Sequence, residues 1–287
     1  MPRAQIQPAL WFETWGEPSG QPLLLISGLG MQVTGWPQGF IDALVVANFH
    51  VLGYDNRDVG LSDWFDHEGL PDMPGVLFGT APAPYLIADM ADDAARLMAH
   101  VGWDSAHVVG VSMGGMIAQE FAIRHPHLVL SLTSIMSTPH LLSAGMSTPE
   151  VIEGMLKPRS EDLETFLDEE LASWQLTAGP GYPPDATWVR EQALTALNRA
   201  RHPEGVQRHL AAIIASPDRR EGLGRVTAPT LILHGENDPL VQIDGGEATH
   251  AAVAHSTFHR YPGLGHQIPE PLWDDVAARI SAVAARA

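Results

Sequence analysis

The sequence contains no cysteine and few basic residues: lysine and arginine together number 16, against 34 aspartates and glutamates. Without cysteine the chain cannot form disulfides, use a thiol nucleophile or bind a metal through thiolates. The net charge of −18 repels phosphate backbones and anionic membranes, so we expect neither nucleic acid nor a membrane as a partner. We interpret the charge as a solvated acidic surface, which says little about the chemistry.

Long apolar segments are also missing from the sequence. No run approaches the ~18 apolar residues that a membrane span needs, and Met1–Pro8 lacks the apolar core of a secretory signal. We therefore expect a cytoplasmic protein. Apolar residues nevertheless make up 45% of the chain and charged residues only 17%, which is sufficient for a large buried core.

Short apolar runs bounded by turn residues recur along the chain, with the length of buried parallel strands. These runs are Leu23–Ile26, Val51–Tyr54, His107–Val111, Val129–Ile135, Thr230–Leu233 and Thr257–Tyr261. Segments with helical periodicity lie between them, for example Tyr85–Val101 and Trp273–Val283. This alternation predicts an α/β fold with a mostly parallel, doubly wound sheet that is covered on both faces.

The alternation stops after Ile135. Residues 141–217 contain no convincing strand but four candidate helices, namely Pro149–Leu156, Ser160–Leu176, Thr187–Arg199 and Glu204–Ala215. In the last of these an apolar stripe predicts packing on an apolar surface; its members are Val206, Leu210, Ile213 and Ile214. We therefore expect a core formed by residues 1–140 and 218–287, with a helical cap, residues 141–217, inserted into it.

The pentapeptide Gly-Val-Ser-Met-Gly at 110–114 matches the pattern G-x-S-x-G, and it lies between an apolar run and the helical segment Gly115–Ile123. A serine in such a sharp strand-to-helix turn projects from the carboxyl edge of a sheet, and the flanking glycines permit the strained backbone. The alternative is a glycine-rich turn that binds phosphate, which the acidic charge and the absence of a following lysine disfavour. We predict that Ser112 is a nucleophile.

A serine hydroxyl needs a general base at neutral pH, because it is a weak nucleophile by itself. Of the 14 histidines, His266 has the position that this role requires. It follows the run Thr257–Tyr261 and precedes the final helical segment, which places it on a loop at the carboxyl edge of the sheet. We predict that His266 is the base.

The acid that orients this histidine should lie between Ser112 and His266, since a G-x-S-x-G nucleophile is followed by the acid and then the histidine. Two carboxylates, Glu236 and Asp238, lie in the turn after the run Thr230–Leu233. We predict Asp238, because the acid must clear the end of the strand to reach the imidazole, and Glu236 is the alternative. An aspartate that merely caps a turn before a proline is also consistent with the pattern.

With these motifs the chain resembles the α/β-hydrolase superfamily over nearly its whole length. The segment Tyr54–Ser62 is similar to the superfamily's D-x-R-G-x-G-x-S motif, in which we expect Arg57 to tie loops together. The resemblance implies an oxyanion hole formed by the backbone N–H groups of Leu29 and Met113, each worth about 3 kcal/mol. The superfamily commonly has His-Gly where this chain has Ser-Gly at 27 and 28, which leaves the anchoring of that loop open.

Four segments also resemble the group of aclacinomycin methylesterase and serine-dependent macrolide esterases, namely Gly35-Trp36, Tyr54–Ser62, Asp89–Asp93 and His107–Gln119. The resemblance implies hydrolysis of bulky polyketide esters or lactones. A cap above the nucleophile suits such substrates, and the side chains that we expect to line it are Trp174, Trp188, Met146 and Met155. The same side chains would serve equally well to pack the cap onto the core.

The sequence thus predicts a serine carboxylic-ester hydrolase for a small-molecule ester or lactone, with no cofactor and no metal. His255 and His259 lie beside and on a predicted strand, Ser256–Tyr261, and in an extended chain side chains four residues apart are too distant to chelate an ion readily. A nucleophilic serine disfavours the aspartate-dependent dehalogenases and epoxide hydrolases of this fold. The alternatives are a small-ester esterase or perhydrolase, a carbon–carbon bond hydrolase, and a non-enzymatic receptor for a small ligand.

Overall fold

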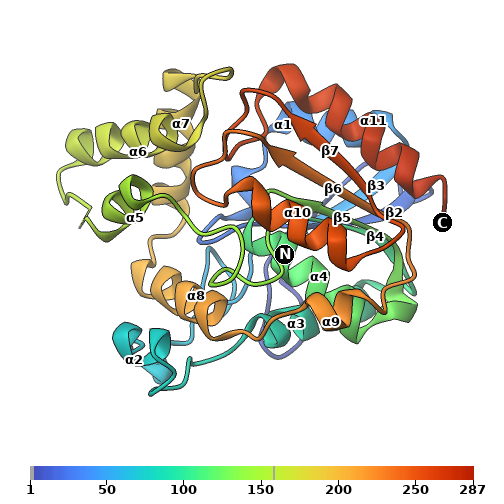
Figure 1. Cartoon of the computed structure of the whole chain (residues 1–287), viewed down its shortest axis with the longest axis horizontal. Coiled ribbons are helices and arrows are strands. Elements are labelled where there is room, and N and C mark those ends of the chain that lie inside the picture. The colour runs from blue at the N-terminus through green and yellow to red at the C-terminus, as the bar shows by residue number, and fades with distance from the viewer. Residues whose placement is uncertain (1–2, 158) are drawn as a thin grey trace.

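The computed structural model describes residues 3–157 and 159–287, and its centre is a seven-stranded sheet (Figure 1). The strands are β1 (Phe12–Trp15), β2 (Gln21–Ile26), β3 (Phe49–Tyr54), β4 (Ala106–Val111), β5 (Val129–Ile135), β6 (Thr230–Gly235) and β7 (Thr257–Tyr261). Their order is β1-β3-β2-β4-β5-β6-β7, and β1 alone runs antiparallel to its neighbour. The mostly parallel sheet predicted from the sequence is confirmed.

Helices cover both faces of this sheet. The α-helices of the described residues, which include those of the insertion described below, are α1 (Gln38–Val46), α2 (Met73–Leu77), α3 (Ile87–Val101), α4 (Met113–Arg124), α5 (Pro149–Leu156), α6 (Leu163–Thr177), α7 (Ala186–Arg199), α8 (Pro203–Ala215), α9 (Arg220–Leu223), α10 (Ile243–Ala252) and α11 (Trp273–Ala284). Because successive side chains of a strand face opposite ways, Leu23 and Leu25 of β2 pack with α1 and α11, whereas Leu24 and Ile26 pack with α3 and α4. Among the described residues, no helix has the length and apolarity needed to cross a membrane.

The helix α3 shows how the sequence forms these elements. Its buried side chains recur at intervals of three and four residues; they include Ile87, Met90, Ala91, Ala94, Leu97 and Met98. At its start the Asp89 carboxylate accepts a 2.8 Å hydrogen bond from the N–H of Leu86. Gly102, with φ of 76°, ends the helix in the left-handed conformation that glycine tolerates. The helix thus presents one apolar face to the sheet.

A helical insertion separates β5 from β6, and the described residues between these strands contain no strand. Each of the four helices predicted here overlaps one of α5 to α8. In Figure 1, α5, α6 and α7 lie together on one side of the molecule, while α8 lies apart from them, beside α2. The division into a core and a cap at residues 141 and 217 stays a prediction.

The buried face of α8 differs from the predicted one. Val206 is 37% exposed and Leu210 is half-buried, whereas Ile213 is buried as expected. Two large polar side chains are also buried on this helix: Arg208 is 1% exposed and His209 is fully buried. Polar groups can occupy a buried face where each donor finds an acceptor, so the assumption that only apolar side chains face inward was wrong for this helix.

The edge strand β1 was not predicted from the sequence. Its four residues, Phe-Glu-Thr-Trp, pair with β3, and none of them is fully buried. A short, half-exposed edge strand lacks the continuous apolar run by which the buried strands are recognised.

Candidate active site

Ser112 lies in the turn between β4 and α4, with φ of 57° and ψ of −122°. This strained conformation aims its side chain away from the strand. The turn requires glycine on both sides: a Cβ at Gly110 would lie 2.0 Å from the carbonyl oxygen of Gly114, and a Cβ at Gly114 would lie 2.1 Å from that of Ile26. The backbone N–H of Ser112 donates to the carbonyl of Ile135 at 2.8 Å. The local backbone is therefore that of a nucleophile elbow.

His266 and Asp238 meet at the carboxyl ends of β7 and β6. The Nδ1–H of His266 donates to Asp238 Oδ2 at 2.6 Å, and the aspartate side chain is inaccessible to solvent. The other oxygen, Oδ1, accepts 2.9 Å hydrogen bonds from the N–H groups of Leu240 and Val241. These bonds fix the carboxylate, and the carboxylate fixes the imidazole ring. The alternative acid, Glu236, is exposed to solvent.

Ser112 lies at the same edge of the sheet, because β4, β6 and β7 belong to one parallel set and each of the three residues follows the end of its strand. Among the described residues His266 is hydrogen-bonded to Asp238 and not to Ser112. Hydrogen bonds of catalytic groups are often long in the unliganded state and tighten when substrate binds.

The loop after β2 runs beside the serine. A Cβ at Gly28 would lie 3.3 Å from that of Ser112, so the two backbones are adjacent. The N–H of Leu29 has no acceptor among the described residues, and that of Met113 belongs to the first turn of α4, where amides have no partner within the helix. Two unpaired donors beside the nucleophile are what an oxyanion hole requires.

Ser27 anchors this loop at the position where the superfamily commonly has a histidine. Its hydroxyl oxygen accepts a 3.0 Å hydrogen bond from Trp36 Nε1, and its carbonyl accepts one of 3.1 Å from Asn56 Nδ2. All three side chains are buried. The pattern Gly-Trp at 35 and 36, noted above as part of a resemblance, therefore has a physical role in holding the loop.

His209 of α8 is a second anchor, which sequence reasoning missed. Its Nδ1 accepts a 3.4 Å hydrogen bond from the N–H of Gly30, and its Nε2–H donates to the carbonyl of Arg57 at 2.7 Å. Burial lowers the pKa of His209 to about 4, so the ring is neutral at ordinary pH. One histidine among 14 gives no signal in the sequence, because its partners are backbone atoms distant along the chain.

The segment after β3 ties α3 and α8 to the sheet. Arg57 forms two hydrogen bonds to Asp93 of α3, at 2.6 and 2.8 Å, so it ties this loop to a helix, whereas the sequence predicted a tie between loops. Asp58, with φ of 66°, receives two 2.8 Å hydrogen bonds from Arg208 of α8. Burial raises the pKa of Asp58, but hydrogen bonds, led by those of Arg208, outweigh it and hold that pKa below its ordinary value.

The four predicted pocket residues lie on or beside the helical insertion. Trp174 of α6 and Trp188 of α7 pack edge to face, with ring centroids 5.2 Å apart, and so join these two helices. Met146 and Met155 are 50% and 45% exposed. The structure thus brings the two tryptophans together and leaves the methionines at the surface; their contact with substrate stays a prediction.

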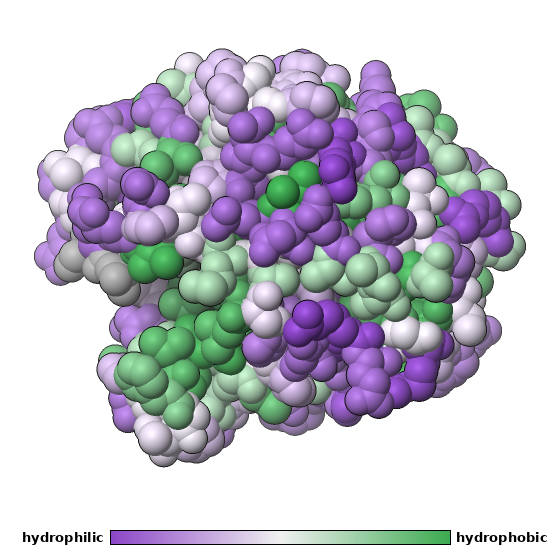
Figure 2. Space-filling model, viewed as in Figure 1, coloured by the Kyte–Doolittle hydropathy of each residue, from purple (hydrophilic) through white to green (hydrophobic). Residues whose placement is uncertain are grey.

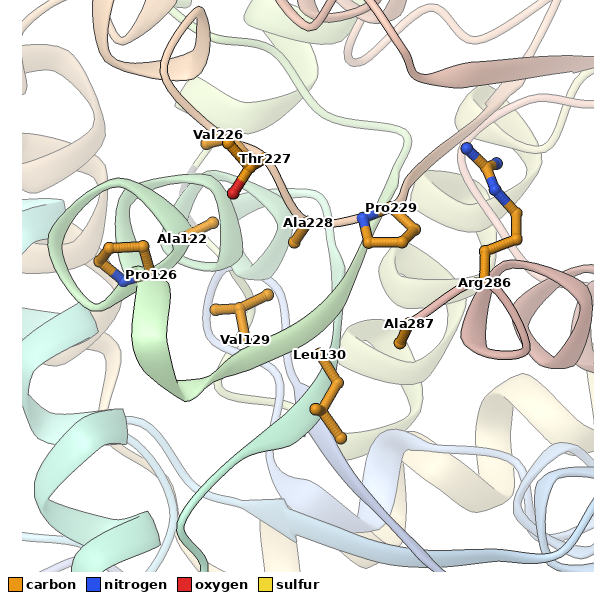
Figure 3. A pocket seen from close by; sticks show the side chains of 10 residues that line it. All are labelled: Ala122, Pro126, Val129, Leu130, Val226, Thr227, Ala228, Pro229, Arg286 and Ala287. Carbon is orange, nitrogen blue, oxygen red and sulfur yellow. The ribbon is translucent and has the colours of Figure 1, made fainter.

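A hollow of about 290 Å³, shown in Figure 3, lies at the amino ends of β5 and β6. It is lined by the first residues of β5, by the segment before β6 and by Arg286 and Ala287. Ser112 follows the far end of β4, which is parallel to β5, so the length of the strands separates the hollow from the serine. We assign it no role in the chemistry.

Comparison with known proteins agrees with this geometry. A family model described as "alpha/beta hydrolase fold" matches residues 21–270. Rhodomycin D methylesterase DnrP of Streptomyces peucetius is 29% identical, over 95% of this chain and 94% of that protein. The bifunctional esterase/perhydrolase DCH of Acinetobacter calcoaceticus is 25% identical, over 91% and 90%. The structure of 2-hydroxy-6-oxo-6-phenylhexa-2,4-dienoate hydrolase from Rhodococcus sp. strain RHA1 matches with a TM-score of 0.75 and 19% identity, over 100% and 98%.

The family match covers most of the chain, and its limits include the nucleophile elbow, the acid turn and the histidine loop. The resemblance to methylesterases that the sequence motifs indicated is confirmed by the first of these relatives. The chain belongs to the α/β-hydrolase fold family.

Proposed function

We propose that this protein is a serine hydrolase of carboxylic esters, with Ser112 as nucleophile, His266 as general base and Asp238 as the residue that orients the base. The observation that carries the proposal is the 2.6 Å hydrogen bond from His266 to buried Asp238, at the sheet edge that also bears strained Ser112. As a family member with methylesterase relatives, the protein is a hydrolase of ester bonds.

The reaction follows from these positions. Ser112 Oγ attacks the ester carbonyl carbon while His266 Nε2 takes the hydroxyl proton, and the N–H groups of Leu29 and Met113 bind the oxyanion. The bond to the alcohol oxygen then breaks, and His266 returns the proton to that oxygen. In the second half, water attacks the acyl-enzyme, gives a proton to His266 and releases the acid, and Ser112 is protonated again.

The proposed substrate is a bulky, mostly apolar ester or lactone, such as a polyketide methyl ester or a macrolide. The methylesterase relatives support this choice. Apolar surface gathers over α2 and α8, beside a hollow in the outline of the molecule (Figure 2); exposed apolar side chains there are Leu70, Leu77, Phe78 and Val206. Val206 contacts Gly30, since a Cβ at that glycine would lie 2.9 Å from it. This surface therefore reaches the oxyanion loop.

The proposed cap, residues 141–217, would close over such a substrate. Remote apolar contacts position the reacting carbonyl, and a small acetyl ester makes few of them. The esterase/perhydrolase relative keeps a small-ester enzyme as the second candidate. The ratio of kcat/KM for large esters to that for small esters distinguishes an enzyme for bulky substrates from a small-ester enzyme.

The test of the chemistry is Ser112→Ala, with Ser19→Ala at an exposed turn as the matched control. Ser112→Ala should lower hydrolysis of p-nitrophenyl butyrate by at least ~10³-fold without altering the melting temperature, because it deletes the atom that forms the acyl-enzyme. A fluorophosphonate probe should label wild type and Ser19→Ala but not Ser112→Ala. Persistent labelling of Ser112→Ala would mean that the nucleophile is another residue.

The substrate claim is tested in the same assay by comparing kcat/KM for p-nitrophenyl butyrate, an anthracycline methyl ester and a macrolide lactone. We expect the large substrates to be preferred. A clear preference for the butyrate, with no cleavage of either polyketide, would remove the substrate claim and leave the serine mechanism intact.

A further inference from the structure

Two residues of α8, Val206 and His209, contact the turn that carries the proposed oxyanion donor Leu29. Its own hydrogen bond joins the N–H of Met31 to the carbonyl of Gly28 at 3.2 Å. Gly30, at the third position, has φ of 65°, which favours glycine in this place of a turn. Val206 packs against Gly30, and His209, one helical turn further along α8, accepts the hydrogen bond from its N–H at 3.4 Å.

The two contacts of His209 require one tautomer. The carbonyl of Arg57 can only accept, so Nε2 carries the proton and donates to it at 2.7 Å. Nδ1 then holds a lone pair, which is what the N–H of Gly30 needs. The short bond to Arg57 locks the ring, and the locked ring presents its acceptor to the loop. His209 is also fully buried, so water cannot substitute for either contact.

We propose that His209 is a positioning residue for the reaction, which sets the oxyanion loop through the N–H of Gly30. The peptide that it holds adjoins the peptide bearing the N–H of Leu29. Without the hydrogen bond from Gly30 to His209, both peptides are free to rotate, and the N–H of Leu29 no longer points at the place where the oxyanion forms. The inference rests on the proposed function, and it assigns to α8 a part in transition-state stabilisation that is separate from substrate binding.

The test compares His209→Gln with His209→Leu. Glutamine offers an amide oxygen to Gly30 and an N–H group to Arg57, whereas leucine fills similar space without either. Gln207→Leu, on the exposed face of the same helix, is the matched control. If His209→Leu does not fold, His209→Met takes its place, because its flexible apolar chain fills the same space.

With p-nitrophenyl butyrate, His209→Leu should lower kcat by about tenfold to a hundredfold with KM changed by less than about threefold, since an oxyanion donor acts in the transition state. His209→Gln should recover most of kcat. Inhibition by phenyl trifluoromethyl ketone, which forms a tetrahedral oxyanion on the serine, should weaken in parallel with kcat/KM. Inhibition by acetophenone, its unreactive counterpart, should not change.

The inference is overturned if folded His209→Leu keeps wild-type kcat, or if His209→Gln is as impaired as His209→Leu while both melt at the same temperature. It is also overturned if binding of the trifluoromethyl ketone is unaffected. Ser112→Ala is measured alongside: an inactive wild type, or an active Ser112→Ala, refutes the proposed function itself. Loss of activity in Ser112→Ala with full activity in His209→Leu refutes only the role of His209.

Discussion

Two parts of the helical insertion, α8 and the pair α5 and α6, are attached to the sheet by different kinds of side chain. α8 buries Arg208 and His209 in polar contacts with the loops after β2 and β3. In α5 and α6 the described side chains buried as apolar core are Val151 and Leu167, one in each helix. α7 is intermediate, because its Arg199 contacts buried Asp55 and Gln32, each at 2.7 Å. A satisfied buried polar network specifies one geometry, whereas sparse apolar contacts permit repacking. We infer that α8 supports the chemistry and that α5 and α6 adapt to the substrate.

The two parts also differ in where they touch the catalytic loops. α8 reaches the oxyanion loop, through Gly30. The C-terminal end of α6 reaches the histidine loop: the N–H of His266 donates to the carbonyl of Thr177 at 2.7 Å, and that of Gly265 donates to the carbonyl of Ala178 at 2.7 Å. Substrate-dependent movement of α6 would therefore shift the loop that carries the proposed general base His266, whereas α8 holds the oxyanion loop in place.

The largest effect is expected from Arg208→Met. This change leaves the buried carboxylate of Asp58 without its cationic partner, which costs roughly 3–5 kcal/mol of unfolding free energy for a buried pair. Urea denaturation, followed by circular dichroism, measures the loss. A change below about 1 kcal/mol would show that α8 is no more firmly attached than the other helices and would remove the basis of the comparison.

The control for this prediction is the double variant in which Arg208→Met is combined with Asp58→Asn. Asparagine adopts the left-handed conformation of residue 58, φ 66°, with little strain, and it removes the unpaired charge. The double variant should therefore recover part of the lost stability. Equal instability of the single and double variants would mean that the packing of the Arg208 side chain, and not its charge, attaches α8 to the core.

The elements at the sheet edge were predictable because each has a local signature. Ser112 follows an apolar run and is flanked by glycines that the strained turn requires, and these features are visible in five consecutive residues. Asp238 and His266 follow apolar runs in the same way, and parallel strands bring their carboxyl ends to one edge. Chain order and strand ends are thus sufficient to bring the three residues to that edge.

The buried face of α8 was not predictable by the same means. Hydrophobic periodicity assumes that the side chains facing the core are apolar, but Arg208 and His209 are buried because Asp58, Gly30 and Arg57 provide their partners. Those partners lie about 150 to 180 positions away along the chain. A pattern confined to one helix contains no information about them.

An intermediate effect is expected from Gln267→Leu. The Gln267 amide donates to the carbonyls of Ala178 and Tyr182, and so ties the histidine loop to the segment after α6. Leucine leaves the carbonyl of Tyr182 unpaired and removes one of the two hydrogen bonds to that of Ala178. This loosens the loop that carries His266, so kcat/KM should fall by about tenfold. Gln242→Leu, which removes a comparable bond to the carbonyl of Met146, should leave kcat/KM unchanged. Equal losses in both variants would mean that the histidine loop has no special link to α6.

The smallest effect is expected at Arg190 of α7, which pairs with Asp168 at 2.6 Å and with Glu164, both on α6. The arginine side chain is 31% exposed and the two carboxylates are 74% and 73% exposed, so water competes for every contact. Exposed pairs of this kind contribute less than about 1 kcal/mol, and salt screens them further. Arg190→Gln should therefore lower the urea midpoint only slightly at low salt, and the difference from wild type should vanish in 1 M NaCl, a concentration at which the screening length is about 3 Å. A salt-independent loss as large as that of Arg208→Met would mean that α6 and α7 form a rigid unit, and α6 would then no longer be an adaptable part of the insertion.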